Sequence, residues 1–65
     1  MEDLNQLKLV LVKKKKTNKW LAEELGVNQT TVSKWCTNTT QPDLQTLKQI
    51  SKLLKVGIQE LVCFD

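Results

Sequence analysis

The sequence predicts an all-α fold, in which five short helices pack compactly around one hydrophobic core. Apolar residues recur at the 3- and 4-residue spacing of a helix face, and turn residues separate these stretches at short intervals. No stretch of useful length alternates as a strand does. Helices of two or three turns are unstable alone, so all five must share the core. We expect a single domain over residues 1–65, with its ordered core at about residues 4–62.

The first helix is expected over about Leu4–Lys14. Leu4, Leu7 and Leu11 recur on one of its faces, and the lysines at its C-terminal end suit the helix dipole. The apolar run Leu9–Val12 could also be a strand on its own. The longer periodicity favours a helix.

Two further helices are predicted on either side of a glycine turn. The second, Trp20–Leu25, can be capped by Thr17 or Asn18. Gly26 ends it, because glycine adopts a left-handed C-cap conformation without steric cost. The third, Asn28–Cys36, takes its asparagine as N-cap. A polar loop that ends in proline follows.

Asp43 can cap a fourth helix with a wide apolar stripe, and Gly57 is expected to break it. A short fifth helix follows, with Ile58, Leu61 and Val62 on its apolar side. The predicted core draws on all five helices and comprises Leu7, Val10, Leu11, Leu21, Ala22, Leu25, Val27, Val32, Trp35, Leu44, Leu47, Ile50, Leu54, Ile58 and Leu61.

The net charge of +3 is unevenly distributed. Residues 1–3 carry −2, residues 4–42 carry +5 from seven lysines and two glutamates, and residues 43–65 are neutral. A positive surface in the first two-thirds of the chain suits a partner that bears phosphates. Lysine-rich faces are also often simply solvated, so both interpretations stay open for Lys13–Lys16.

Composition argues against catalysis, metal binding and membrane insertion. There is no histidine, and Cys36 and Cys63 are too few for a zinc site and lack a histidine base. No apolar run approaches the ~20 residues of a membrane span, and the acidic start is unlike a signal peptide. We expect a cytoplasmic protein with reduced thiols, without metal, cofactor or enzymatic activity.

The segment Asn18–Cys36 has the residue types that two steeply crossing helices need. Ala22 is small enough to lie where the helices touch, and Gly26 accepts the positive φ of the turn. The third helix then turns outward polar side chains with no negative charge. These are Gln29, Thr30, Ser33 and Lys34, with Thr31 at the boundary. Such a surface can enter the major groove of DNA.

Four stretches of the chain, in order and at matching spacing, resemble the lambda-repressor/Cro-type helix-turn-helix family, also called the XRE family. They are Leu21–Val27, Thr31–Trp35, Gln41–Leu47 and Leu53–Leu61. Each stretch alone is a weak signal, whereas the four together are specific. The resemblance covers nearly all of Leu4–Val62. It implies a DNA-binding domain of a bacterial or phage transcriptional regulator that acts by occupying an operator.

The resemblance also implies which side chains contact double-stranded DNA. Base edges would be contacted by Gln29, Thr30, Thr31 and Lys34. Glutamine can address adenine, a threonine methyl can meet a thymine methyl, and lysine can donate to guanine. Phosphates would be contacted from the second and third helices and the loop after them, at Asn18, Asn28, Ser33, Thr37, Asn38, Thr39 and Thr40.

The chain departs from the family pattern at several positions. It has no arginine, so Lys34 is the one cationic side chain that could read bases. Lys15 and Asn38 replace frequent glycines. A left-handed lysine costs on the order of 1 kcal/mol, whereas asparagine tolerates that conformation. Lys16 replaces a common apolar residue, and Cys36 replaces an acid that ties the third helix to its neighbours.

A domain of this size covers one DNA half-site, so two copies on a palindrome are expected. The fourth and fifth helices with Val62, Cys63 and Phe64 offer a surface for a homodimer. Two alternatives stay open: an antitoxin whose main partner is a toxin, and a protein-interaction module on the same fold. Trp20 is expected to pack half-exposed against the first helix or to join a partner surface.

Overall fold

The computed structural model describes residues 4–63. These form α1 (Leu7–Lys13), α2 (Asn18–Leu25), α3 (Gln29–Cys36), α4 (Leu44–Leu54) and the 3-10 helix η1 (Ile58–Glu60). The predicted all-α fold class is confirmed. The fifth helix is of a different type from the predicted one, because its three residues form only a 3-10 turn.

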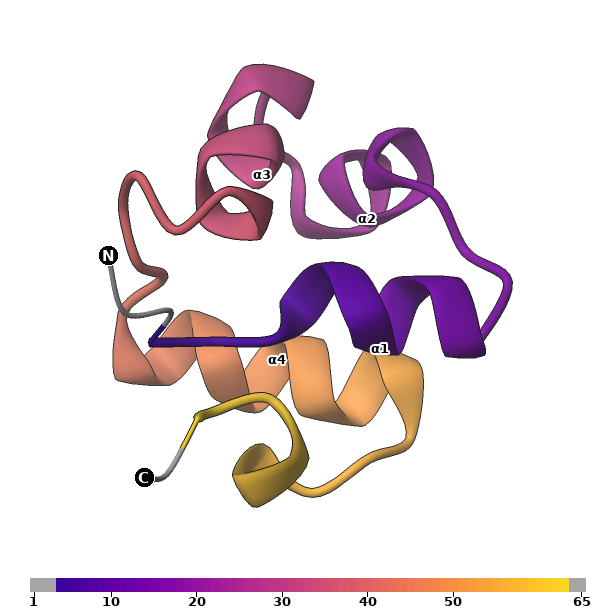
Figure 1. Ribbon diagram of the computed structural model, residues 1–65. Helices are drawn as coiled ribbons and strands as arrows, with labels where there is room; N and C mark the ends of the chain where they lie inside the picture. Colours follow the sequence, from indigo (N-terminus) through magenta and orange to yellow (C-terminus); the bar gives the residue numbers. More distant parts are fainter. Residues whose placement is uncertain (1–3, 64–65) are drawn as a thin grey trace.

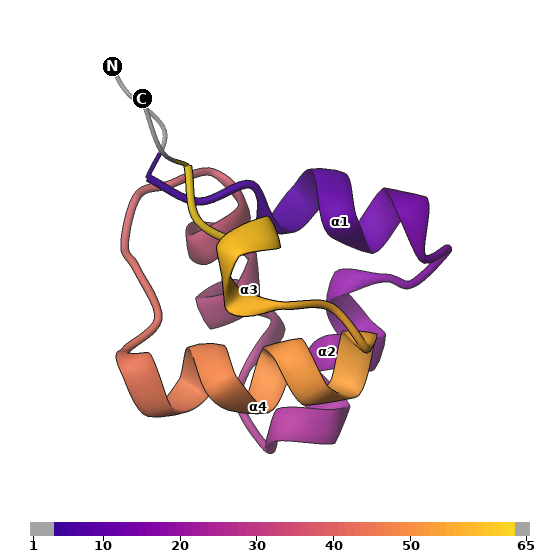
Figure 2. The same cartoon turned by 90° about the horizontal axis from the view of Figure 1, so that it is seen from below.

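The helices lie in two groups (Figure 1). α2 and α3 lie together in the upper part of the view, and α1, α4 and η1 lie below them. Figure 2 shows that α1 and α4 run in the same direction, so that their C-terminal ends lie on the same side of the molecule. Within residues 4–63, no helix combines the length and the hydrophobicity needed to span a bilayer.

The start of α1 differs from the prediction. The helix begins at Leu7 rather than Leu4, because the residues before it pair with the C-terminal segment. Asn5 and Val62 form an isolated antiparallel bridge. The Cys63 N–H donates to the Leu4 carbonyl at 3.0 Å. Leu4 is therefore 57% exposed instead of lying on the core face of a helix.

The core of the described residues follows the predicted periodicity. The buried hydrophobic residues all belong to the predicted core and are Leu7, Val10, Leu11, Leu21, Ala22, Val32, Trp35, Ile50, Leu54 and Leu61. The prediction is wrong for Leu44, which is 70% exposed, and for Val27, which is 37% exposed. Leu25, Leu47 and Ile58 are half-buried. The two exposed residues lie at a helix start and in a turn, where periodicity alone does not report burial.

A left-handed residue follows each of the four α-helices, and after three of them it is not a glycine. Lys15 has a φ of 58° and Asn38 a φ of 59°. Both residues stand where the helix-turn-helix family often has a glycine, so a left-handed backbone was expected there. The prediction that Gly57 breaks the fourth helix is wrong. α4 ends at Leu54 with Lys55 as a left-handed C-cap, whereas Gly57 has an extended backbone.

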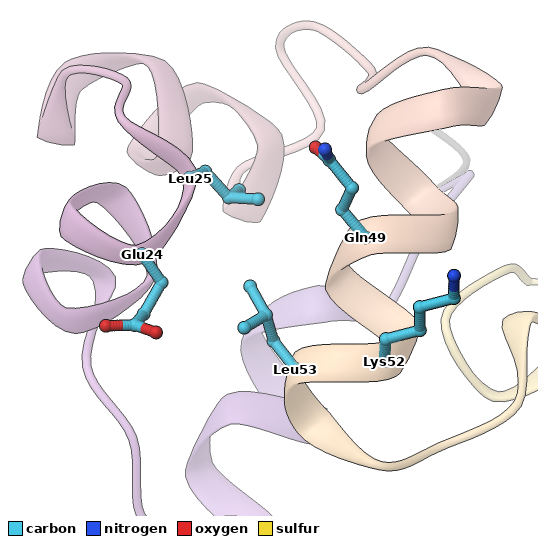
Figure 3. Close-up of a pocket in the computed structure, with 5 residues that line it drawn as sticks. All are labelled: Glu24, Leu25, Gln49, Lys52 and Leu53. Carbon is cyan, nitrogen blue, oxygen red and sulfur yellow. The ribbon is translucent and has the colours of Figure 1, made fainter.

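α2 and α4 face each other across a shallow hollow of about 270 Å³. Figure 3 shows Leu25 and Leu53 pointing into the space between the two helices, whereas the charged ends of Glu24 and Lys52 point away from each other. Gln49 completes the lining. The hollow is thus an incompletely filled helix–helix contact with apolar side chains at its centre.

Candidate nucleic-acid interface

The turn between α2 and α3 depends on the backbone conformation of Gly26. Its φ of 71° and ψ of 32° place it in the left-handed region, which glycine adopts without steric cost. A Cβ at this position would meet no atom within 4 Å, so the conformation rather than space requires glycine. The Val27 N–H donates to the Ala22 carbonyl at 3.0 Å, which closes the end of α2.

The two faces of α3 divide as the sequence predicts. Val32 and Trp35 are buried, at 0% and 7% exposure, and α3 packs in the core against α2 and α1. The opposite face turns outward the exposed side chains of Gln29, Thr30, Ser33 and Lys34, with Thr31 half-buried at its edge. Spacings of three and four residues align Thr30, Ser33 and Lys34 along one strip of the helix.

The N-cap positions of α2 and α3 are built differently. Thr17 caps α2 with its hydroxyl, which accepts from the Trp20 N–H at 3.0 Å. Asn28 occupies the N-cap position of α3 with an extended backbone, but its exposed side chain makes no capping hydrogen bond. The prediction that Asn28 is the N-cap residue of α3 is confirmed for its backbone, whereas its side chain does not cap the helix.

Asn18 links the start of α2 to the end of α3. It is half-buried, and its Oδ1 accepts from the Cys36 thiol at 3.4 Å. Burial raises the pKa of that thiol, and the nearby Lys8 ammonium lowers it by less, so Cys36 stays a protonated donor. A weak thiol hydrogen bond thus stands where the family commonly has an acid.

The loop after α3 presents hydroxyl groups that are already ordered by hydrogen bonds. The Thr37 hydroxyl donates to the Lys34 carbonyl at 3.2 Å and lies 2.8 Å from the Thr39 hydroxyl. The Thr39 N–H donates to the same carbonyl at 2.9 Å. Thr37, Thr39 and Thr40 are all exposed, so this loop continues the polar surface of α3.

A cluster of polar side chains fastens this loop to the N-terminal segment. Asn5 is 4% exposed, and its amide donates to the Trp35 carbonyl at 3.1 Å and to Gln41 Oε1 at 2.6 Å. Its Oδ1 accepts from the Leu7 N–H at 3.0 Å. The Asn38 Oδ1 accepts from the backbone N–H groups of residues 4 and 5, both at 2.9 Å, and its amide donates to the Asn5 carbonyl.

This cluster changes what can be expected of two residues. Sequence reasoning missed Asn5, because a single asparagine at the start of an amphipathic segment carries no signal of its partners 30 and 36 residues away. The side chain of Asn38 holds the N-terminal segment, so its predicted phosphate contact stays a prediction. Within residues 4–63, no three His, Cys, Asp or Glu side chains come together as a metal site would require.

Comparison with known proteins is consistent with this arrangement. The helix-turn-helix family model matches residues 7–61. The chain is 39% identical over 62 residues to the HTH-type transcriptional activator BcrR of Enterococcus faecalis. The aligned region covers 95% of this chain and 30% of that protein. It is 43% identical to the crystal structure of a proposed DNA-binding protein from Bacteroides fragilis. That match has a TM-score of 0.91 and covers 92% of this chain and 97% of the other.

Proposed function

Because the chain belongs to the helix-turn-helix family, we propose that it binds double-stranded DNA sequence-specifically and regulates transcription by occupying an operator. The observation that carries this proposal is the outward face of α3, which is exposed and polar, carries no acid and includes Lys34 as a cation. A helix with one face fixed in the core and the other presented in this way can enter the major groove. A cytoplasmic location and an action without catalysis are part of the same proposal.

We assign the base contacts to the outward face of α3. Gln29 and Lys34 have the reach and the donors to read adenine and guanine edges. Thr30 projects from the same face, and Thr31, half-buried at its edge, would offer its methyl group to a thymine.

We assign the phosphate contacts to the two flanks of this face. Asn28 is available on one flank, since its side chain makes no capping bond, and Ser33 would reach a phosphate from the exposed strip that it shares with Thr30 and Lys34. The hydroxyls of Thr37, Thr39 and Thr40 lie on the other flank. Asn18 and Asn38 would act mainly by holding the C-terminal end of α3, with backbone N–H groups nearby for phosphate oxygens.

Selection of bound duplexes from a random pool, followed by salt titration of the selected sequence, tests DNA binding. We expect an enriched motif and a slope of log affinity against log salt of roughly −3 to −6, since each phosphate contact contributes about −0.9. A slope near zero would exclude DNA binding.

Lys34→Ala tests the assignment of α3 as the recognition helix. We expect a loss of about 1–3 kcal/mol in binding free energy and a weaker preference at one base pair. Lys48→Ala is the matched control on a duplex with one half-site, because it removes an exposed lysine from α4 and a single copy needs no dimer contact there. Unchanged affinity and base preference in Lys34→Ala would contradict the assignment.

We further propose that two copies bind a palindrome as a homodimer through α4, η1 and the C-terminal residues. Leu44 offers an exposed apolar side chain on α4, and Val62 and Cys63 are half-buried. Phe64, which the sequence places on the same surface, lies outside the described residues. Sedimentation equilibrium of the chain and of Leu44→Ser tests this surface, and we expect the substitution to weaken association.

A further inference from the structure

Five lysines gather where α1 and α4 end on the same side of the molecule (Figures 1 and 2). Lys14, Lys16 and Lys55 line one hollow of about 250 Å³, together with Trp20. Lys14 and Lys55 also line a neighbouring hollow, in which Lys13 joins them. We call Lys13–Lys16 and Lys55 the lysine corner; all five side chains are exposed.

Two of these lysines occupy positions that favour glycine. Lys15 and Lys55 have φ values of 58° and 57°, and each follows the end of a helix as a left-handed residue. Glycine adopts this conformation without the steric cost that a side chain brings, as it does at Gly26. The chain therefore carries lysine at two places in one corner where lysine lowers stability. This favours a role for the charge itself.

The surroundings leave the positive charge of the corner largely uncompensated. Glu60, whose carboxylate accepts from the Gly57 N–H at 2.8 Å, is the acid among the residues that line the two hollows, against four lysines. Lys16 is held over the face of Trp20, with its Nζ 4.8 Å from the ring centroid. The half-buried Trp20 thus packs against Lys16 and orients its ammonium group.

The lysine corner reaches the DNA-facing side of the domain through Lys16. Lys16 is followed by the N-cap Thr17 and by Asn18, the first residue of α2. The resemblance to the helix-turn-helix family places a phosphate contact at Asn18. Lys16 precedes Asn18 by two positions, with Thr17 alone between them, so a duplex seated on α3 and on the start of α2 would continue past Lys16.

We propose that the lysine corner binds backbone phosphates of the same duplex, beyond those contacted by α3 and its flanking loop. The proposal rests on the DNA-binding function proposed above and extends its footprint on one side. The corner contributes affinity without base preference, because ammonium groups meet phosphates and no base edge. Because the chain has no arginine, its base contacts supply only modest affinity for DNA, and the phosphate contacts of the corner would add to it.

The double substitution Lys15→Gly/Lys55→Gly separates this role from a structural one. Glycine suits both backbone conformations, so we expect the Tm to rise by roughly 2–6 °C. On a duplex that extends a full turn beyond the half-site, we expect Kd at 0.15 M salt to rise about 10- to 30-fold. The salt slope should become shallower by about 2, with the selected motif unchanged. Stability and DNA affinity would thus move in opposite directions.

The control Lys48→Gln/Lys52→Gln removes two exposed lysines from α4 outside the corner. Because a duplex with one half-site seats a single copy, the dimer surface proposed on α4 does not enter this measurement, and we expect the control to change Kd less than threefold. On a duplex trimmed to the half-site, the glycine variant should bind within about twofold of wild type. An unchanged slope on the long duplex, an equal loss on the trimmed one, or an equal loss in the control would each overturn the proposal. If the wild-type chain itself selects no duplex, the proposed function fails instead.

Discussion

The two ends of α3 are held in different ways. At its C-terminal end, the Asn5 side chain bonds to the Trp35 carbonyl from the interior, and Asn38 binds the N-terminal segment to the loop. At its N-terminal end, the helix follows the Gly26 turn, and the Asn28 side chain makes no capping bond. One end therefore depends on specific side chains, whereas the other depends on a permitted backbone conformation. Substitutions at the two ends should differ in the size and in the kind of their effect.

Asn5→Ala should have the largest effect on stability. It removes three hydrogen bonds at a buried site and leaves the Trp35 carbonyl without this donor, so we expect a loss of about 2–4 kcal/mol in the free energy of unfolding. That loss is a large part of the total free energy of unfolding of a domain of this size. Urea denaturation measures it. Gln41→Ala is the control, because it removes one partner at an exposed site, and it should cost less than about 1 kcal/mol. Equal losses would show that Asn5 is not the anchor.

Gly26→Ala should have an intermediate effect at the opposite end. No atom lies near the added Cβ, so the cost arises from the left-handed backbone alone, about 1–2 kcal/mol in the free energy of unfolding. Gly26→Asn should cost less, because asparagine tolerates this conformation. Thermal unfolding of the two variants measures the difference. An asparagine variant no better than alanine would mean that contacts of the added side chain with its surroundings, and not the positive φ, require the glycine.

The difference between the two ends also explains what the sequence could predict. The faces of α3 follow from helical periodicity, and the turn follows from Gly26, since both signals are local. The anchoring of the other end depends on contacts between residues more than thirty positions apart, and no local pattern reports them. The pairing of Asn5 with Val62 displaces the start of α1 for the same reason. The family resemblance implied the DNA contacts of the outward residues of α3 but not the role of Asn5.

Asn28→Ala should scarcely alter stability and should weaken DNA binding. Its side chain makes no capping bond, so we expect a change in unfolding free energy of less than about 0.5 kcal/mol. Thr17→Ala is the matched comparison, because Thr17 does cap its helix, and it should cost about 1 kcal/mol. Urea denaturation and DNA titration of both variants measure the two effects. A stability loss in Asn28→Ala as large as that in Thr17→Ala would contradict the contrast between the two caps.

Asp43, which ends the loop that Asn38 begins, should give the smallest effect, visible only in acid. Hydrogen bonds from the side chain and the backbone N–H of Thr46 lower the pKa of its carboxyl, so folding favours the ionised form. This stabilisation is present above the unfolded pKa and is lost as the pH falls through the lower folded pKa. Because asparagine caps without a charge, the Tm of wild type minus that of Asp43→Asn should decrease between about pH 6 and pH 3. Thermal unfolding across this range measures the difference, and a value independent of pH would show that the cap does not depend on its charge.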